Sequence, residues 1–222
     1  MLNKKLLAAA VASTLIAPFA LADVTIYGTM NASVENVKAD GATNAANNLG
    51  SVNRLSSNTT KLGFKGTDDL GDGMKALWQV EQEVSIDDGG TRKGTFATRN
   101  SFVGVEGGFG RILLGNNDTV YKSIAKAGMV NTMGDTIADV CSDKAVFCRG
   151  DARLQNSIHY YTKNYSGFQG GASYGFDEVR TTVGGARTNK ARWSLAASYT
   201  DGGLSAGFGY DVAGSNSTAS CN

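Results

Sequence analysis

The chain has almost no proline: the single proline among its 222 residues is Pro18, close to the N-terminus. It also has only one histidine and three cysteines, while glycine is abundant at 29 residues. Glycine without proline is unlike a disordered linker and suits tight turns between strands whose ladders use every backbone N–H. After the first 22 residues, no stretch approaches 18 consecutive apolar residues, so we expect no membrane-spanning helix.

The first 22 residues have the features of a secretory signal peptide. Lys4 and Lys5 form a basic start, residues 6–17 are apolar, and residues 20–22 (Ala-Leu-Ala) fit the small-x-small cleavage pattern. The apolar run is too short to span a bilayer as a helix, which argues against a membrane anchor. We therefore expect an exported protein with a mature domain of residues 23–222.

The charges of the mature part nearly balance. Without the two leader lysines, the 21 basic residues fall to 19, against 20 acidic ones. This balance gives no indication of a nucleic-acid partner. With one histidine a catalytic triad has one possible base, and no serine, cysteine or carboxylate pair stands in a catalytic context. We therefore expect neither an enzyme nor a cofactor.

Alternation of apolar and polar residues dominates the mature chain and recurs about nine times. In one segment Leu154, Ile158 and Tyr160 oppose Ser157 and His159. Strict alternation places one face of a strand in an apolar medium and the other in a polar one. The pattern predicts an all-β, antiparallel fold, although a soluble β-sandwich has the same local pattern.

The connections between the predicted strands alternate between long and short. The long ones are residues 37–50, 87–95, 117–151 and 177–189, and the short ones are 68–73, 107–108, 164–167 and 201–203. Transmembrane β-barrels have short turns at one membrane face and longer loops at the other. A barrel must also close, because unpaired backbone groups in hydrocarbon each cost several kcal/mol, and bacterial barrels have an even number of strands. Nine strands and a polar end therefore predict that the sequence is the N-terminal part of a longer chain.

Three sequence blocks are distinctive: residues 24–28 (Val-Thr-Ile-Tyr-Gly), 61–66 (Lys-Leu-Gly-Phe-Lys-Gly) and 99–104 (Arg-Asn-Ser-Phe-Val-Gly). They resemble the first strands of Gram-negative general porins, most closely the trimeric porins of Neisseria, Burkholderia and their relatives. The resemblance covers essentially the whole mature chain. It implies a transmembrane β-barrel of about 16 strands in the cell outer membrane, assembled as a homotrimer among outer-membrane lipid. It also implies a water-filled channel for passive diffusion of ions and small hydrophilic solutes.

The resemblance makes residues 117–151 the candidate loop that folds into the lumen and narrows the pore. This segment holds Asp135, Asp139 and Asp143, and residues 134–136 (Gly-Asp-Thr) resemble the acidic tip of the family's third loop. The alternative is an ordinary solvated loop.

Basic residues of the barrel wall would stand opposite these acids. Lys61 faces inward by alternation because Leu62 and Phe64 must meet lipid, and Arg99 and Arg153 match wall arginines of the family. Opposed charges across a narrow pore would set up a transverse field. The alternative for the three basic residues is generic lumen polarity, and Thr29 replaces a further basic residue of enterobacterial relatives, so no ion selectivity is predicted.

The spacing of Cys141 and Cys148 allows a small disulfide in an oxidising periplasm. Such a bond would contribute about 2–3 kcal/mol by loop-closure arithmetic. The alternative is that one of them pairs with Cys221. No metal site is expected, because His159 is far in sequence from every cysteine and fits a polar position on the lumen wall.

Two other functions remain open from the sequence. A substrate-specific channel for phosphate or sugars would need a lysine cluster or an aromatic ladder along the lumen, and neither is evident in this part of the chain. A secreted β-rich adhesin would stay soluble without detergent.

Overall fold

The computed structural model describes residues 23–88, 96–126, 134–135, 139, 148, 150–177, 182–183, 186–187 and 191–214. Nearly all regular structure is β. The strands are β1 (Asp23–Thr29), β2 (Ala32–Ala39), β3 (Leu49–Ser57), β4 (Lys61–Gly71), β5 (Met74–Glu83), β6 (Ser101–Gly107), β7 (Gly110–Asp118), β8 (Arg153–Tyr161), β9 (Phe168–Gly175), β10 (Thr182–Val183), β11 (Ala186–Arg187), β12 (Arg192–Asp201) and β13 (Leu204–Ala213). Two short helical turns are η1 (Ala45–Asn47) and η3 (Tyr121–Ala125). Among the described residues, no helix is long and apolar enough to cross a membrane.

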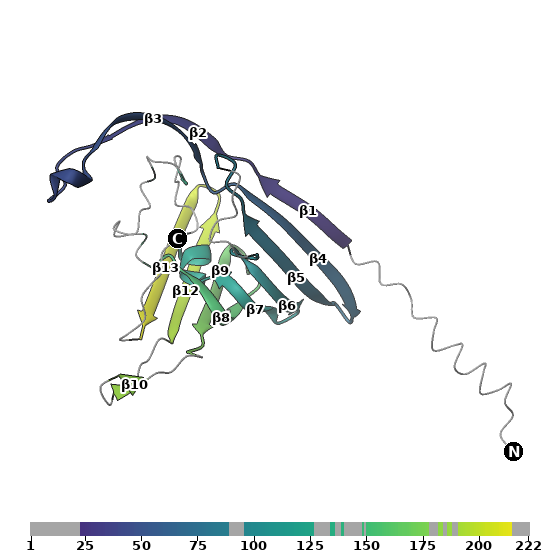
Figure 1. Cartoon of the computed structure of the whole chain (residues 1–222). Coiled ribbons are helices and arrows are strands. Elements are labelled where there is room, and N and C mark those ends of the chain that lie inside the picture. The colour runs from purple at the N-terminus through teal and green to yellow at the C-terminus, as the bar shows by residue number, and fades with distance from the viewer. Residues whose placement is uncertain are drawn as a thin grey trace, which may run out of the picture.

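Nine strands form one antiparallel sheet in the order β1-β4-β5-β6-β7-β8-β9-β12-β13 (Figure 1). Each strand therefore pairs with its neighbour along the chain once the hairpins β2–β3 and β10–β11 are set aside. This meander confirms the predicted all-β antiparallel fold and its nine main strands. Within the described residues the sheet does not close, and β1 and β13 are its two edges.

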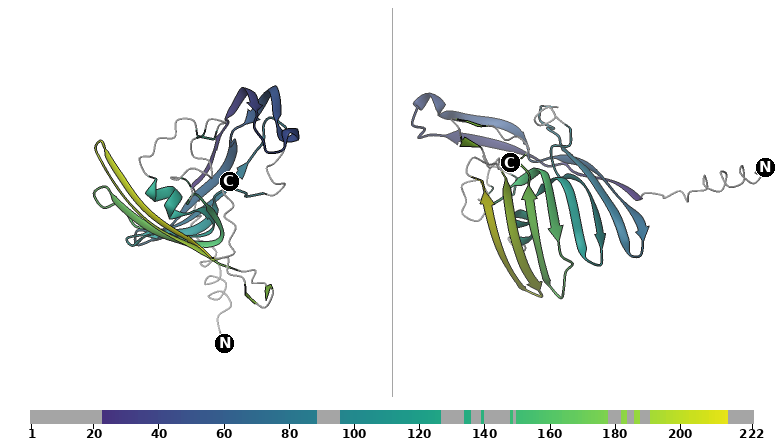
Figure 2. Two further views of the ribbon diagram at one scale, coloured as in Figure 1. Left: turned by 90° about the vertical axis from the view of Figure 1, so that its left-hand side faces the viewer. Right: turned by 90° about the horizontal axis from the view of Figure 1, so that it is seen from below.

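The sheet is strongly curved (Figure 2), and the exposures of its side chains show that its two faces have opposite polarity. On the convex face large apolar side chains are exposed, including Val103 at 59%, Leu195 at 46% and Phe208 at 67%. On the other face the side chains of Ser194 and His159 are fully buried. A water-soluble sandwich would bury its apolar face, so this inverted polarity is that of a barrel wall in lipid.

The turn from β4 to β5 depends on glycine. Gly71, Asp72 and Gly73 have φ values of +83°, +51° and +74°, which lie in the left-handed region. Glycine adopts this region without strain, and aspartate tolerates it better than most residues. Three successive residues of this kind reverse the chain within the short connection that the sequence predicts at residues 68–73.

The long connection predicted at residues 37–50 is shorter in the structure, where residues 40–48 join β2 to β3. The two ends of the predicted segment are strand residues of the hairpin β2–β3, which extends away from the main sheet in Figure 1. Polar cross-strand pairs hold the hairpin: Arg54 Nε lies 2.8 Å from Glu35 Oε2, and the amide of Asn36 donates to Asn53 over 2.7 Å. The hairpin is polar on one face, so its composition resembles that of a loop.

The alternation in β8 also fails at one position. It predicts that Leu154 shares the exposed face with Ile158 and Tyr160, but Leu154 is only 8% exposed. The pairing of β7 with β8 shifts register after Gly115, and Asn156 has a φ of +48°. Such a bulge reverses the face to which the preceding side chains point.

Candidate functional site

Helix η3 lies at the start of the β7–β8 connection and packs on the concave face of the sheet, against β9, β12 and β13 (Figure 2). Its contacts form the buried cluster Leu113, Val120, Ile124, Tyr161 and Ala196. Small residues of the wall make room for the helix. A Cβ at Gly207 would lie 1.9 Å from the carbonyl oxygen of Ala125, and one at Gly209 would lie 2.5 Å from the Tyr121 ring. The first turn of the long connection therefore lies inside the curve of the sheet.

The first part of the site joins β1, β4 and β5 on this face. The hydroxyl of Tyr27 donates to Glu81 Oε2 over 2.9 Å, and Lys61 Nζ lies 4.0 Å from the same oxygen. Between them, Gly63 pairs with both Tyr27 and Glu81 in the sheet. A Cβ at Gly63 would lie 2.4 Å from the Tyr27 ring, so only glycine lets this ring cross β4. This arrangement places Lys61 on the concave face, as the alternation predicts.

Arg99 lies just before β6 and completes this cluster. Its Nε lies 2.8 Å from Glu81 Oε1, and its Nη1 lies 3.1 Å from Glu83 Oε2. Burial lowers the pKa of Arg99, but hydrogen bonds and charge from the two glutamates outweigh it and raise the pKa. The guanidinium therefore stays charged, and it is held by two charge-assisted contacts.

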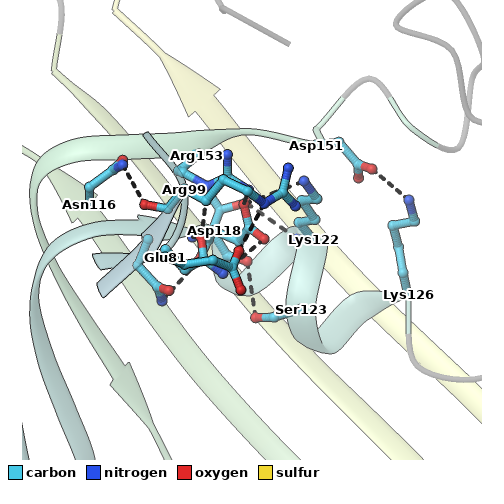
Figure 3. A network of polar contacts seen from close by, with 12 residues as sticks. Glu81, Arg99, Asn116, Asp118, Lys122, Ser123, Lys126, Asp151 and Arg153 are labelled. Atoms are coloured by element: carbon cyan, nitrogen blue, oxygen red, sulfur yellow. Dashed lines mark hydrogen bonds and ion pairs between the residues drawn. The ribbon is translucent and has the colours of Figure 1, made fainter. Parts of the chain in front are cut away.

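The second part of the site surrounds Asp118 at the end of β7 (Figure 3). Arg153 Nη2 lies 3.1 Å from Asp118 Oδ1, and Lys122 Nζ of η3 lies 3.4 Å from the same oxygen. Asn100 connects the pair, because its Oδ1 accepts from Arg153 Nε over 2.7 Å and its Nδ2 donates to Asp118 Oδ2 over 3.2 Å. Asn100 follows Arg99 directly, so the two parts of the site are adjacent.

The predicted basic residues Lys61, Arg99 and Arg153 thus come together on one face, each beside an acid of the wall. The sequence analysis missed these acids, which are Glu81, Glu83 and Asp118. A signal existed for the two glutamates, since they share the polar alternation of their strand. Asp118 stands at a strand end next to the bulge and gives no such signal.

The predicted acidic residues are described in part. The backbone N–H of Asp135 donates to Asp139 Oδ2 over 2.9 Å, and Asp135 has a φ of +61°. Asp143 lies outside the described residues. The side chain of Asp139 therefore caps a turn at the position where the acidic tip is predicted, and its place opposite the basic wall stays a prediction.

Cys148 is in a disulfide bond and is 2% exposed. The two other cysteines, Cys141 and Cys221, lie outside the described residues, so the pairing with Cys141 stays a prediction. Nearby, Lys126 Nζ forms an ion pair with Asp151 Oδ2 over 2.6 Å and ties the end of η3 to the returning chain. No group of acidic, cysteine and histidine side chains in the described part of the chain could hold a metal ion.

An open wall of an antiparallel transmembrane barrel, with a charged band on its concave face, is the class of structure that these observations define. The model of the Gram-negative porin family matches residues 7–220. The chain belongs to this family of outer-membrane proteins.

Individual relatives agree with this assignment. The chain is 34% identical over 212 residues to the major outer membrane protein P.IB of Neisseria meningitidis serogroup B, a match that covers 94% of this chain and 58% of the relative. It is 33% identical over 215 residues to the outer membrane porin protein 32 of Delftia acidovorans, covering 94% of this chain and 59% of that protein. Among solved structures, an anion-selective porin from Comamonas acidovorans has 28% identity and a TM-score of 0.56, covering 80% of this chain and 64% of the other. The chain thus spans somewhat more than half the length of these curated relatives.

Proposed function

We propose that the protein, at its full natural length, is a water-filled channel for passive diffusion of ions and small hydrophilic solutes across the outer membrane. The observation that carries this proposal is the inverted polarity of the curved sheet: exposed apolar side chains on the convex face and charged side chains on the concave one. A closed barrel with this polarity has a wet lumen. Passive diffusion needs no catalytic residue.

The charged band is the proposed pore wall. Lys61, Arg99 and Arg153 would face the acids of the 117–151 connection, which include Asp135, Asp139 and Asp143, across the lumen. At an effective dielectric of ~20, two opposite charges ~8 Å apart interact by about 2 kcal/mol. A field of this size orients a dipolar solute and disfavours an apolar one. The packing of η3 on the concave face supports an inward course for the connection.

A homotrimer is proposed from the resemblance to trimeric porins. Each copy would contribute its own lumen, since the concave face of one sheet already carries Lys61, Arg99 and Arg153 together. The substrate-specific channel is the second candidate, but no observation on the described wall favours phosphate or sugars over other polar solutes.

The test is reconstitution of the full-length protein into planar bilayers. We expect stepwise, ohmic conductance, with steps in groups of three. We also expect faster gel mobility after heating of a detergent extract, because heat dissociates the trimer into monomers. Current that saturates with one solute at low concentration would support the substrate-specific channel instead. A protein that stays dissolved and monomeric without detergent would contradict both channel functions.

A further inference from the structure

The chain's only histidine lies directly beneath the start of η3. His159 is on β8, opposite Ser173 of β9, and its side chain is fully buried. Ser173 Oγ lies 2.8 Å from His159 Nδ1 and also accepts the backbone N–H of Val120 over 2.9 Å. Val120 is the residue at which η3 begins, so the Ser173 hydroxyl joins the imidazole to the start of this helix.

The other ring nitrogen is bound to the wall. Ser157 Oγ lies 2.8 Å from His159 Nε2, and it also lies within 2.7 and 2.8 Å of the carbonyl oxygens of Gly115 and Leu154. A carbonyl only accepts, so the single hydroxyl hydrogen of Ser157 goes to one of them. Ser157 must then accept the Nε2–H of the imidazole. This fixes the tautomer: Nδ1 carries no hydrogen and accepts from the hydroxyl of Ser173.

The result is one chain of hydrogen bonds with a single direction. It runs from the N–H of Val120 through Ser173, His159 and Ser157 to the backbone at the register shift between β7 and β8. Each donor in this chain has one acceptor. Because the site is buried, a group left without its partner would cost folding free energy. Around it, Gly171 leaves room for Val120 and Ile124, since a Cβ there would lie 2.8 Å from both side chains.

We propose that His159 is a positioning residue for the loop of the channel: through Ser173 it fixes where the connection leaves the wall and enters the lumen. This proposal rests on the proposed channel function. It assigns the histidine neither to a metal nor to contact with the permeating solute, because its side chain has no exposed surface. In this proposal Nδ1 is hydrogen-bonded through Ser173 to the loop, and Nε2 is hydrogen-bonded through Ser157 to the wall.

The two nitrogens can be separated by substitution. The side-chain oxygen of asparagine can occupy the position of Nδ1, whereas the amide nitrogen of glutamine can occupy that of Nε2. We therefore expect His159→Asn to keep the bond to Ser173 and His159→Gln to keep only the bond to Ser157. The experiment measures amide hydrogen exchange at Val120, together with single-channel current, on the full-length protein in lipid.

We expect His159→Gln to raise the exchange rate at Val120 by about three- to tenfold, as the loss of one hydrogen bond predicts, and to make partial closures more frequent. His159→Asn should exchange at close to the wild-type rate. Equal rates in the two variants would overturn the proposal.

A double-mutant cycle keeps the test valid if a histidine variant folds poorly. In a Ser173→Ala background the loop is already disconnected, so His159→Gln should add nothing to the exchange rate at Val120. An added effect of the same size as in the wild type would overturn the proposal. Wild-type conductance is recorded on the same preparation, so a failure of the channel function is seen separately.

Discussion

Arg99 is joined to Glu81 twice, once through the backbone and once through the side chain. Its N–H donates to the Glu81 carbonyl oxygen over 3.1 Å, while its Nε lies 2.8 Å from Glu81 Oε1. The arginine precedes β6, so these two bonds, together with the ion pair to Glu83, fix its place on the wall. A charge held this firmly contributes a constant field to any lumen in front of it.

Ion selectivity should respond in opposite directions to removal of a wall charge and of a loop charge. Arg99→Ala removes a positive charge, so we expect the permeability ratio to move toward cations by about two- to tenfold at low salt. Asp139→Asn should move it toward anions. Reversal potentials under a salt gradient measure both effects, and conductance should persist in each variant. Arg54→Ala, on the β2–β3 hairpin, is the matched control. If neither charge removal changes the reversal potential, the assignment of the constriction is wrong.

Gly63 of β4 should not tolerate a larger side chain. A methyl group there would lie 2.4 Å from the Tyr27 ring and would push its hydroxyl away from Glu81. We expect Gly63→Ala to lower the free energy of unfolding by about 1–3 kcal/mol, which is the usual cost of overpacking. Gly108→Ala is the control, because nothing lies within 4 Å of a Cβ at that position. Urea unfolding in micelles compares the two variants, and equal midpoints would contradict the close contact.

The main strands were predictable because lipid and water impose a period of two on every one of them. The basic residues of the wall followed from the same rule together with the resemblance. The separation of the hairpin β2–β3 from the main sheet was not predictable, because alternation continues past Thr29 to Val34 and polar contacts such as Arg54 with Glu35 have no periodic signature. Periodicity alone could not reveal η3, because Tyr121–Ala125 is too short to show a helical repeat.

The partners of the basic residues were harder to predict for a geometric reason. Arg153 of β8 meets Asp118 at the end of β7 and Asn100 just before β6, and the contact depends on the bulge that follows Gly115. A bulge changes the face of the side chains beside it, and a one-residue change in register is invisible to a pattern of period two.

Helix η3 should be displaced when a side chain is added to a glycine of the wall beneath it. A Cβ at Gly207 would lie 1.9 Å from the carbonyl oxygen of Ala125, so Gly207→Ala must displace the helix or the strand. We expect the single-channel conductance to change by about a factor of two while the barrel still inserts, because the displaced segment borders the lumen. Gly203→Ala is the control in the adjacent turn, with nothing within 4 Å. Wild-type conductance in Gly207→Ala would show that η3 does not border the conducting path.

The β2–β3 hairpin should loosen in acid. A hydrogen bond from the Ser33 hydroxyl, followed by those from Arg54 and Ser56, lowers the pKa of Glu35. A lowered pKa means that the ionised form stabilises the hairpin above the carboxyl's usual pKa, and that this contribution is lost as the pH falls through the lowered value. Carbon NMR titration of the Glu35 carboxyl measures the shift. Ser33→Ala should return the pKa toward its usual range, and an unchanged titration would contradict the assigned cause.

The partner of Cys148 decides how the connection is closed. Pairing with Cys141 would form a small ring inside the connection, next to the ion pair of Lys126 with Asp151, and hold its returning end against η3. We therefore expect Cys141→Ser and Cys148→Ser to have the same effect, a loss of about 2–3 kcal/mol by loop-closure arithmetic and noisier single-channel current. Cys221→Ser should leave both properties unchanged. Peptide mapping of the unreduced protein identifies the bond directly, and a fragment linking Cys148 to Cys221 would contradict the small ring, because the bond would then join the connection to a distant part of the chain.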